Sequence, residues 1–195
     1  MDKISYALGL SMGNNFRRSG ITVLNYEDFS EGVKAAFSGE NAKMTLEEAK
    51  QVVNNFFTEM EEQNKEINKK AGEAYLAENA KRPEVKVTAS GLQYQIIKEG
   101  EGECPKKTDR VTVHYTGALI DGQVFDSSIE RGEPATFGVT QVIPGWVEAL
   151  QMMKPGAEWR LFIPSELAYG PNGAGGIIGP NMTLVFDVQL IKVEK

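Results

Sequence analysis

The segment 111–146 combines large apolar side chains with one carboxylate and one guanidinium group. Asp126 and Arg131 are the charged residues of interest, and they lie among Tyr115, Phe125, Phe137, Val142, Ile143 and Trp146. The segment offers no pair of a nucleophile and a neighbouring base, which a hydrolytic site would require. An apolar lining with a few oriented polar groups is typical of a ligand-binding cavity. The segment therefore predicts a binding cavity rather than a hydrolytic site.

The residue types that most often bind metals are nearly absent from the chain. Cys104 is the single cysteine, so it has no partner for an internal disulfide and no neighbour for a structural zinc site. His114 is the single histidine and lies within an alternating strand pattern, without a second ligand at metal spacing. We therefore favour a hydrogen-bonded strand histidine over a metal ligand or general base, and we expect no metal and no cofactor.

Composition limits the partners and the location. The chain of 195 residues is 41% hydrophobic and 25% charged, as in ordinary globular proteins, and its net charge of −6 argues against nucleic-acid binding. It begins Met-Asp-Lys-Ile-Ser-Tyr, without the basic head and apolar core of a secretory signal, and no apolar run reaches membrane-spanning length. We expect a cytoplasmic protein without membrane contact, or a periplasmic one if a leader has been removed.

The elements that would position the cavity residues follow from an alternating pattern that begins near Val85. Asp121-Gly122 supplies a hairpin turn, and Asp126 comes directly after the short return strand. The predicted strands are 91–97, 111–115, 124–125, 158–164 and 183–191, with one short helix over 143–150. Four or five antiparallel strands around one helix predict an α+β half-barrel.

The first part of the chain has a helical period instead. Two short helices are predicted within 4–40, with Asn25 as an N-cap and Gly39 as an end. Thr45 and Glu48 form a capping box that begins a long helix, whose charged middle predicts a solvated arm. We predict a helical region 1–44, a connecting helix 45–82 and a third domain 83–195.

Several large apolar residues of this helical part are hard to cover within a monomer. They are Phe16, Phe37, Phe56 and Phe57. A homodimer formed through the N-terminal helices would bury them. The alternative is that the two short helices fold back and bury them within one chain.

Five sequence blocks resemble FKBP-type peptidyl-prolyl cis–trans isomerases. They are Val113-His-Tyr-Thr-Gly117, Val124-Phe-Asp-Ser-Ser128, Val142-Ile-Pro-Gly-Trp146, Leu167-Ala-Tyr-Gly170 and Thr183-Leu-Val-Phe-Asp187. Ser5-Tyr-Ala-Leu-Gly9 and the long charged helix are similar to the two-domain, macrophage-infectivity-potentiator-like bacterial subgroup. This resemblance implies a V-shaped homodimer with an FKBP-like half-barrel behind an all-α dimerisation domain.

The resemblance also implies a reaction and a set of site residues. Rotation about an X–Pro bond needs no nucleophile or metal, because only the partial double bond of the amide must be twisted. The implied catalytic residues are Asp126, Tyr169, Tyr115, Phe125 and Trp146, with Trp146 as the floor beneath the prolyl ring. The implied substrate-binding residues are Arg131, Phe137, Val142, Ile143, Ile178 and Phe186. Asp126 would pair with Arg131 and Tyr115, while the Tyr169 hydroxyl and the Ile143 N–H would donate hydrogen bonds to the ligand.

Three positions depart from the family pattern at the rim of this pocket. Ala135 stands where many members carry an aromatic residue, Ala174 replaces a bulkier one, and Gly179 interrupts the usual Ile-Pro-Pro. The expected partners are unfolded or proline-containing polypeptides, with macrolide inhibitors as further ligands. The alternative function is a non-catalytic proline-peptide binding module or a holdase chaperone.

Overall fold

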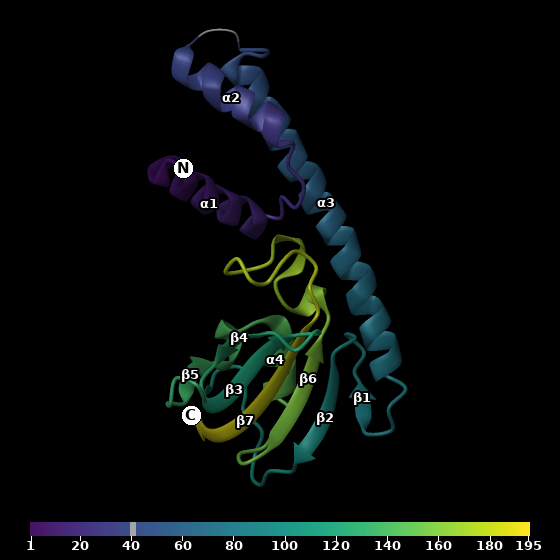
Figure 1. The fold of residues 1–195 in the computed structure, drawn as a ribbon. Coiled ribbons are helices and arrows are strands. Elements are labelled where there is room, and N and C mark those ends of the chain that lie inside the picture. The colour runs from purple at the N-terminus through teal and green to yellow at the C-terminus, as the bar shows by residue number, and fades with distance from the viewer. Residues whose placement is uncertain (40–41) are drawn as a thin grey trace. The chain divides into compact units, whose positions relative to one another are not determined.

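The computed structural model describes residues 1–39 and 42–195. It divides into two compact units, Met1–Asn55 and Phe56–Lys195, and the path of the chain through both can be followed in Figure 1. Residues 40 and 41 lie outside the described residues; the predicted stretch 4–40 includes the first of them, and the predicted region 1–44 includes both. Within the described part, no helix combines the length and the apolar character needed to cross a membrane.

Two capped helices form most of the first unit. Helix α1 spans Lys3–Arg18, and the Asp2 carboxylate accepts a hydrogen bond from the Ser5 N–H at its start. Helix α2 spans Tyr26–Ser38, where the Asn25 side chain caps two N–H groups and Gly39 ends the helix in the left-handed conformation. The predicted N-cap and helix end are thus confirmed. No residue of either helix is buried.

Helix α3 runs without interruption over Leu46–Asn79, 34 residues or about 51 Å. The predicted capping box is confirmed, because the Thr45 hydroxyl accepts from the Glu48 N–H while the Glu48 carboxylate accepts from the Thr45 N–H. The prediction of a solvated arm is wrong for the end of this helix. Gly72 and Asn79 are buried against the sheet, and the Asn79 amide donates to Gln93 Oε1 at 2.8 Å.

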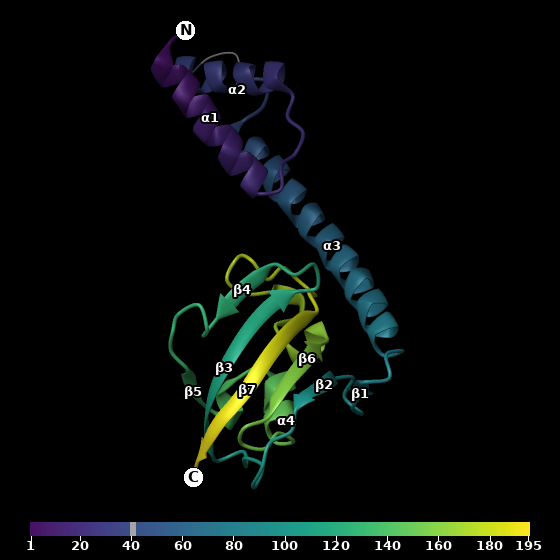
Figure 2. The same cartoon turned by 60° about the horizontal axis from the view of Figure 1, so that its bottom comes forward.

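In the described chain, the second unit contains an antiparallel sheet of seven strands in the order β1-β2-β6-β7-β3-β4. The seventh strand, β5, pairs with the first residues of β3, whereas β4 pairs with its last residues. Figure 2 shows the long strands β3 and β7 side by side at its centre. The strands are β1 Val85–Val87, β2 Gln93–Lys98, β3 Arg110–Leu119, β4 Val124–Ser127, β5 Ala135–Gly138, β6 Glu158–Ile163 and β7 Leu184–Glu194. The expectation of four or five strands missed β1 and β5, which are too short to display an alternating pattern. Asp126 lies within β4 and not after a strand.

Helix α4, Pro144–Leu150, packs on one face of the sheet and completes the core. Pro144 is its first residue, where a backbone N–H would have no partner within the helix, so a proline is tolerated. Trp146, Ala149 and Leu150 of this helix are buried. Strand residues that face it alternate with outward polar ones, as a sheet with one covered face requires. The helix therefore brings Trp146 against the side chains of β3 and β7.

Candidate active site

An apolar cavity of about 430 Å³ lies where α4 meets the sheet and the loops around it. Its lining residues are Tyr115, Phe125, Asp126, Phe137, Gln141, Val142, Ile143, Trp146, Tyr169 and Phe186. They come from β3, β4, β5, β7, α4 and the turns next to them. The cavity is thus assembled from segments far apart in the sequence.

Trp146 forms the aromatic centre of the cavity. It is 4% exposed, and Tyr115 and Phe186 each meet it edge to face with ring centres 5.3 Å away. Phe137 makes a third edge-to-face contact at 6.2 Å. Edge-to-face contacts hold rings in fixed orientations, so the indole face has a defined position. In the described chain, no acceptor meets the buried indole N–H of Trp146 or of Trp159.

Gly117 lets two cavity rings approach the central strand. A Cβ atom at this position would lie 2.6 Å from a ring carbon of Phe186 and 2.7 Å from two ring carbons of Phe125. Those two rings pack edge to face on one another at 5.5 Å. The wall of the cavity therefore depends on a glycine in β3.

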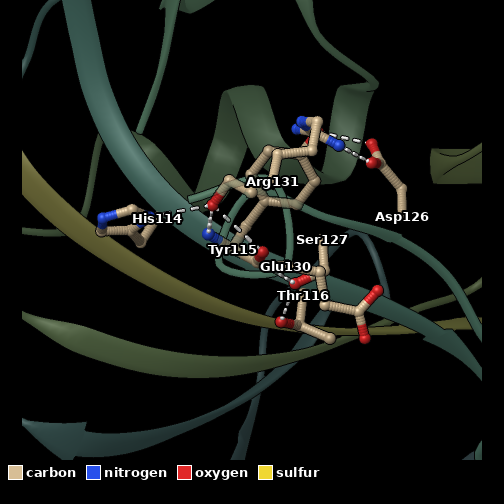
Figure 3. A network of polar contacts seen from close by, with 8 residues as sticks. His114, Tyr115, Thr116, Asp126, Ser127, Glu130 and Arg131 are labelled. Atoms are coloured by element: carbon tan, nitrogen blue, oxygen red, sulfur yellow. Dashed lines mark hydrogen bonds and ion pairs between the residues drawn. The ribbon is translucent and has the colours of Figure 1, made fainter. Parts of the chain in front are cut away.

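One carboxylate is held at the rim of the cavity by two donors (Figure 3). The Tyr115 hydroxyl donates to Asp126 Oδ2 at 2.5 Å, and the Arg131 guanidinium donates to Asp126 Oδ1. Arg131 also donates to the Tyr115 hydroxyl at 3.0 Å and lies over the Tyr115 ring at 5.6 Å. The three side chains form a closed set of contacts, which fixes the orientation of Asp126.

Burial and these contacts shift the pKa values of Asp126 and Tyr115 in opposite directions. Burial raises the pKa of Asp126, but the hydrogen bonds from Tyr115 and Arg131 outweigh it and leave the pKa below the ordinary 3.8. Burial and the hydrogen bond to Asp126 raise the pKa of Tyr115 above 10.0. Because the carboxyl pKa is lowered in the folded chain, its stabilising contribution is present at neutral pH and is lost as the pH falls below the ordinary value.

Hydroxyl groups behind the site hold β4 and the turn after it against β3. The fully buried Ser128 Oγ accepts from the Tyr115 N–H at 2.8 Å and lies 3.0 Å from His114 Nδ1. Ser127 Oγ and Thr116 Oγ1 are 2.9 Å apart, and Figure 3 marks this contact with a dashed line. The interpretation of His114 as a hydrogen-bonded strand histidine is confirmed.

Apart from Arg131 and Ile178, every predicted site residue lines the cavity. Arg131 contacts two of the lining residues, Asp126 and Tyr115, without lining the cavity itself. Ile178 is 8% exposed in the hydrophobic core, and its N–H and C=O pair with Ala174. Its assignment to the substrate site stays a prediction. Gln141 lines the cavity and was missed, because a polar residue in a short turn carries no periodic signal.

Comparison with known families covers both parts of the chain. Residues 101–191 match the family described as FKBP-type peptidyl-prolyl cis-trans isomerase, and residues 1–96 match the domain amino terminal to FKBP-type peptidyl-prolyl isomerase. The chain belongs to the FKBP-type peptidyl-prolyl cis–trans isomerases. The resemblance inferred from the five blocks is confirmed, and so are the activity and the α+β fold with its helical N-terminal part.

Relatives of this FKBP-type isomerase match it over nearly its whole length. "Outer membrane protein MIP" of Legionella longbeachae is 48% identical over 100% of this chain and 86% of the relative. The FKBP-type 22 kDa isomerase of Escherichia coli K12 is 45% identical over 97% and 93%. The crystal structure of FkpA from Escherichia coli superposes with a TM-score of 0.80 at 39% identity, over 98% of this chain and 95% of FkpA.

Proposed function

We propose that the aromatic cavity accelerates X–Pro rotation by binding the twisted amide without covalent chemistry. The observation that carries this proposal is an apolar cavity with one ionised carboxylate, Asp126, oriented at its rim. The planar amide is stabilised by resonance and by water, and its rotation barrier is about 18–20 kcal/mol. An apolar lining excludes that water and favours the less polar twisted form.

In this mechanism the side chains divide into a ring-binding group and a polar group. Trp146 lies beneath the prolyl ring, and the walls are Tyr115, Phe125, Phe137, Val142, Ile143 and Phe186. The Tyr169 hydroxyl and the Ile143 N–H donate to the ligand carbonyls. Asp126 orients the polar groups near the rotating bond, and Arg131 holds Asp126 in place. Macrolides are proposed as competing ligands of the same apolar surface.

Replacing Asp126 with alanine tests this mechanism. We expect kcat/KM for an Ala-Leu-Pro peptide to fall at least about tenfold, because hydrogen bonds to a charged group are worth about 1.5–3 kcal/mol. The measurement is exchange NMR on the full chain, which needs no coupled protease. Glu133→Ala, an exposed acid outside the cavity, is the matched control and should keep the wild-type rate.

The same pair of variants separates catalysis from client binding. We propose that the protein also acts as a chaperone, and an Asp126→Ala chain that still suppresses aggregation of an unfolded client would assign the two activities to different surfaces. Full isomerase rates in Asp126→Ala would contradict the mechanism and favour the alternative of a proline-peptide binding module or holdase.

We further propose that region 1–44 forms a homodimer and that 45–82 connects it to an isomerase domain over 83–195. Most of the exposed large apolar side chains lie in the first 55 residues, including Ile4 at 73%, Leu8 at 60% and Phe37 at 90% exposure. Intramolecular burial, the alternative to a dimer, covers these residues only in part: Phe16 of α1 meets Phe29 of α2 edge to face at 5.6 Å, but neither helix has a buried residue. A second copy of the chain would cover this surface.

Substituting Phe37 with lysine is expected to weaken dimerisation at least about tenfold in sedimentation equilibrium, because the charge would be buried in the interface. Ile97→Lys, which changes an apolar residue of the second unit that is 54% exposed, should leave the dimerisation constant unchanged. Equal effects of both substitutions, or a wild-type chain that sediments as a monomer, would contradict the dimer.

We propose a periplasmic rather than a cytoplasmic location. The support is the name of the Legionella longbeachae relative, "Outer membrane protein MIP", while the cytoplasmic expectation finds no support among the relatives. Recovery of the protein with cytosolic marker enzymes after release of the periplasm would contradict this proposal.

A further inference from the structure

The loop between β6 and β7 carries Tyr169 into the cavity. Two short helical turns, Ser165–Leu167 and Gly170–Asn172, precede a narrow hairpin in which Ala174 and Ile178 pair through both backbone hydrogen bonds. The Asn181 N–H then donates to the Gly170 carbonyl at 2.9 Å and closes the base of the loop. The residue next to Tyr169 is therefore tied directly to Asn181.

Asn181 is itself held by helix α3. Its side-chain amide donates to the Lys65 carbonyl at 3.3 Å, and its φ of 55° makes it the one described non-glycine residue in the left-handed region. Asparagine tolerates that conformation better than most residues. The contact uses the second lone pair of a helical carbonyl, so it leaves the backbone bonding of α3 intact.

Two further residues of α3 contact the same end of the loop. The Asn68 amide donates to the Pro180 carbonyl at 2.8 Å. Gly72 is buried, and a Cβ on it would lie 2.3 Å from Thr183 Oγ1, so only glycine permits this approach. Residues 65, 68 and 72 are spaced by three and four and share one face of the helix. That face therefore contacts residues 180, 181 and 183 at three successive turns.

We infer that Asn68, Gly72 and Asn181, here named the loop clamp, position Tyr169 over the cavity and so set the isomerase rate. They are positioning residues, because none of them lines the cavity. This inference rests on the proposed role of Tyr169 as a donor to the ligand. It assigns to the connecting helix a part in catalysis as well as in joining the two units of the chain.

Two single variants of the full chain test the hydrogen bonds of the clamp. Asn68→Ala removes one hydrogen bond, and Asn181→Gly removes the other while keeping the left-handed backbone accessible. Each should lower kcat/KM about threefold to tenfold, the range expected for one hydrogen bond. Asn64→Ala is the matched control, since Asn64 is exposed on the same helix and should show wild-type values.

The readout beyond activity is NMR of the Tyr169 ring and the Gly170 amide. In both clamp variants these resonances should shift or broaden, whereas those of Asp126 and Trp146 should stay in place. In a Tyr169→Phe background the clamp variants should cause no additional loss of rate, because coupled residues are non-additive. Unchanged Tyr169 and Gly170 resonances in Asn68→Ala and Asn181→Gly would overturn the clamp, as would shifted resonances with a wild-type rate.

Tyr169→Phe on its own distinguishes this inference from the proposed mechanism. Full activity in that variant would overturn the role of the Tyr169 hydroxyl, whatever the clamp variants do. Gly72→Ala gives an independent test by steric means, because its new methyl group must displace Thr183 and with it the end of the loop. We expect the same loss as in Asn68→Ala, and partial recovery when Thr183→Ala is added. Wild-type rate and resonances in Gly72→Ala would overturn the clamp.

Discussion

Replacing Trp146 with phenylalanine is expected to lower kcat/KM about tenfold, whereas Trp159→Phe should leave it within about twofold. The smaller ring removes about 50 Å² of apolar contact with the prolyl ring. At about 25 cal/mol/Å², this loss corresponds to a decrease of close to tenfold in kcat/KM. Exchange NMR with a proline peptide gives the rate, and urea unfolding gives the stability of each variant.

Trp159 is a suitable control because it is buried to the same extent as Trp146 but does not line this cavity. It is 5% exposed, its indole N–H likewise lacks an acceptor in the described chain, and it stacks on Tyr94 with ring centres 4.4 Å apart. Neither substitution removes a hydrogen bond, so both lose stability only through packing, by less than the about 3–5 kcal/mol of a truncation to alanine. Equal rates in the two variants would contradict the floor role of Trp146.

Gly117→Ala is expected to lower kcat/KM about tenfold or more and to reduce the free energy of unfolding by about 1–3 kcal/mol, the usual cost of overpacking a core. The added methyl group would meet Phe125 and Phe186 at 2.6–2.7 Å, so both rings must move, and both line the cavity. The measurements are the same exchange NMR assay and a denaturant titration.

The control for this variant is Gly32→Ala, the same chemical change in helix α2. A Cβ on Gly32 meets nothing within 4 Å, so activity should be unchanged and stability should rise by about 0.5–1 kcal/mol. A Gly117→Ala chain with a wild-type rate and unshifted Phe125 and Phe186 ring resonances would show that the wall tolerates the methyl group.

Elements with a regular pattern could be predicted from the sequence. The strand around Val111–Tyr115 alternates apolar and polar residues, Glu158–Ile163 ends in the apolar run Leu-Phe-Ile, and the capping box at Thr45 marks the start of α3. β5 could not be recognised, because four residues pairing with β3 make a strand only once that partner is in place. Placement of Asp126 within β4 likewise depends on pairing with Gly117 in β3.

The site was accessible from sequence mainly through family resemblance. Composition alone predicted an apolar cavity, and the five blocks supplied the individual residues. The backbone pairing of Ile178 with Ala174 could not be predicted, because it forms only when the loop is folded. The loop clamp was missed for a similar reason, since Asn68 and Gly72 interrupt the apolar stripe by which helix burial is usually recognised.

The two indoles, whose N–H groups find no acceptor among the described residues, give the protein a built-in optical signal. Trp146 and Trp159 are its only tryptophans, and an indole in dry, apolar surroundings without a hydrogen-bond acceptor emits at short wavelength. Trp146 alone borders the cavity, so an arriving prolyl ring changes its surroundings, while Trp159 contributes a constant background from its stack on Tyr94. A Trp159→Phe chain would therefore report occupancy of the cavity by a single fluorophore, without a label and during turnover.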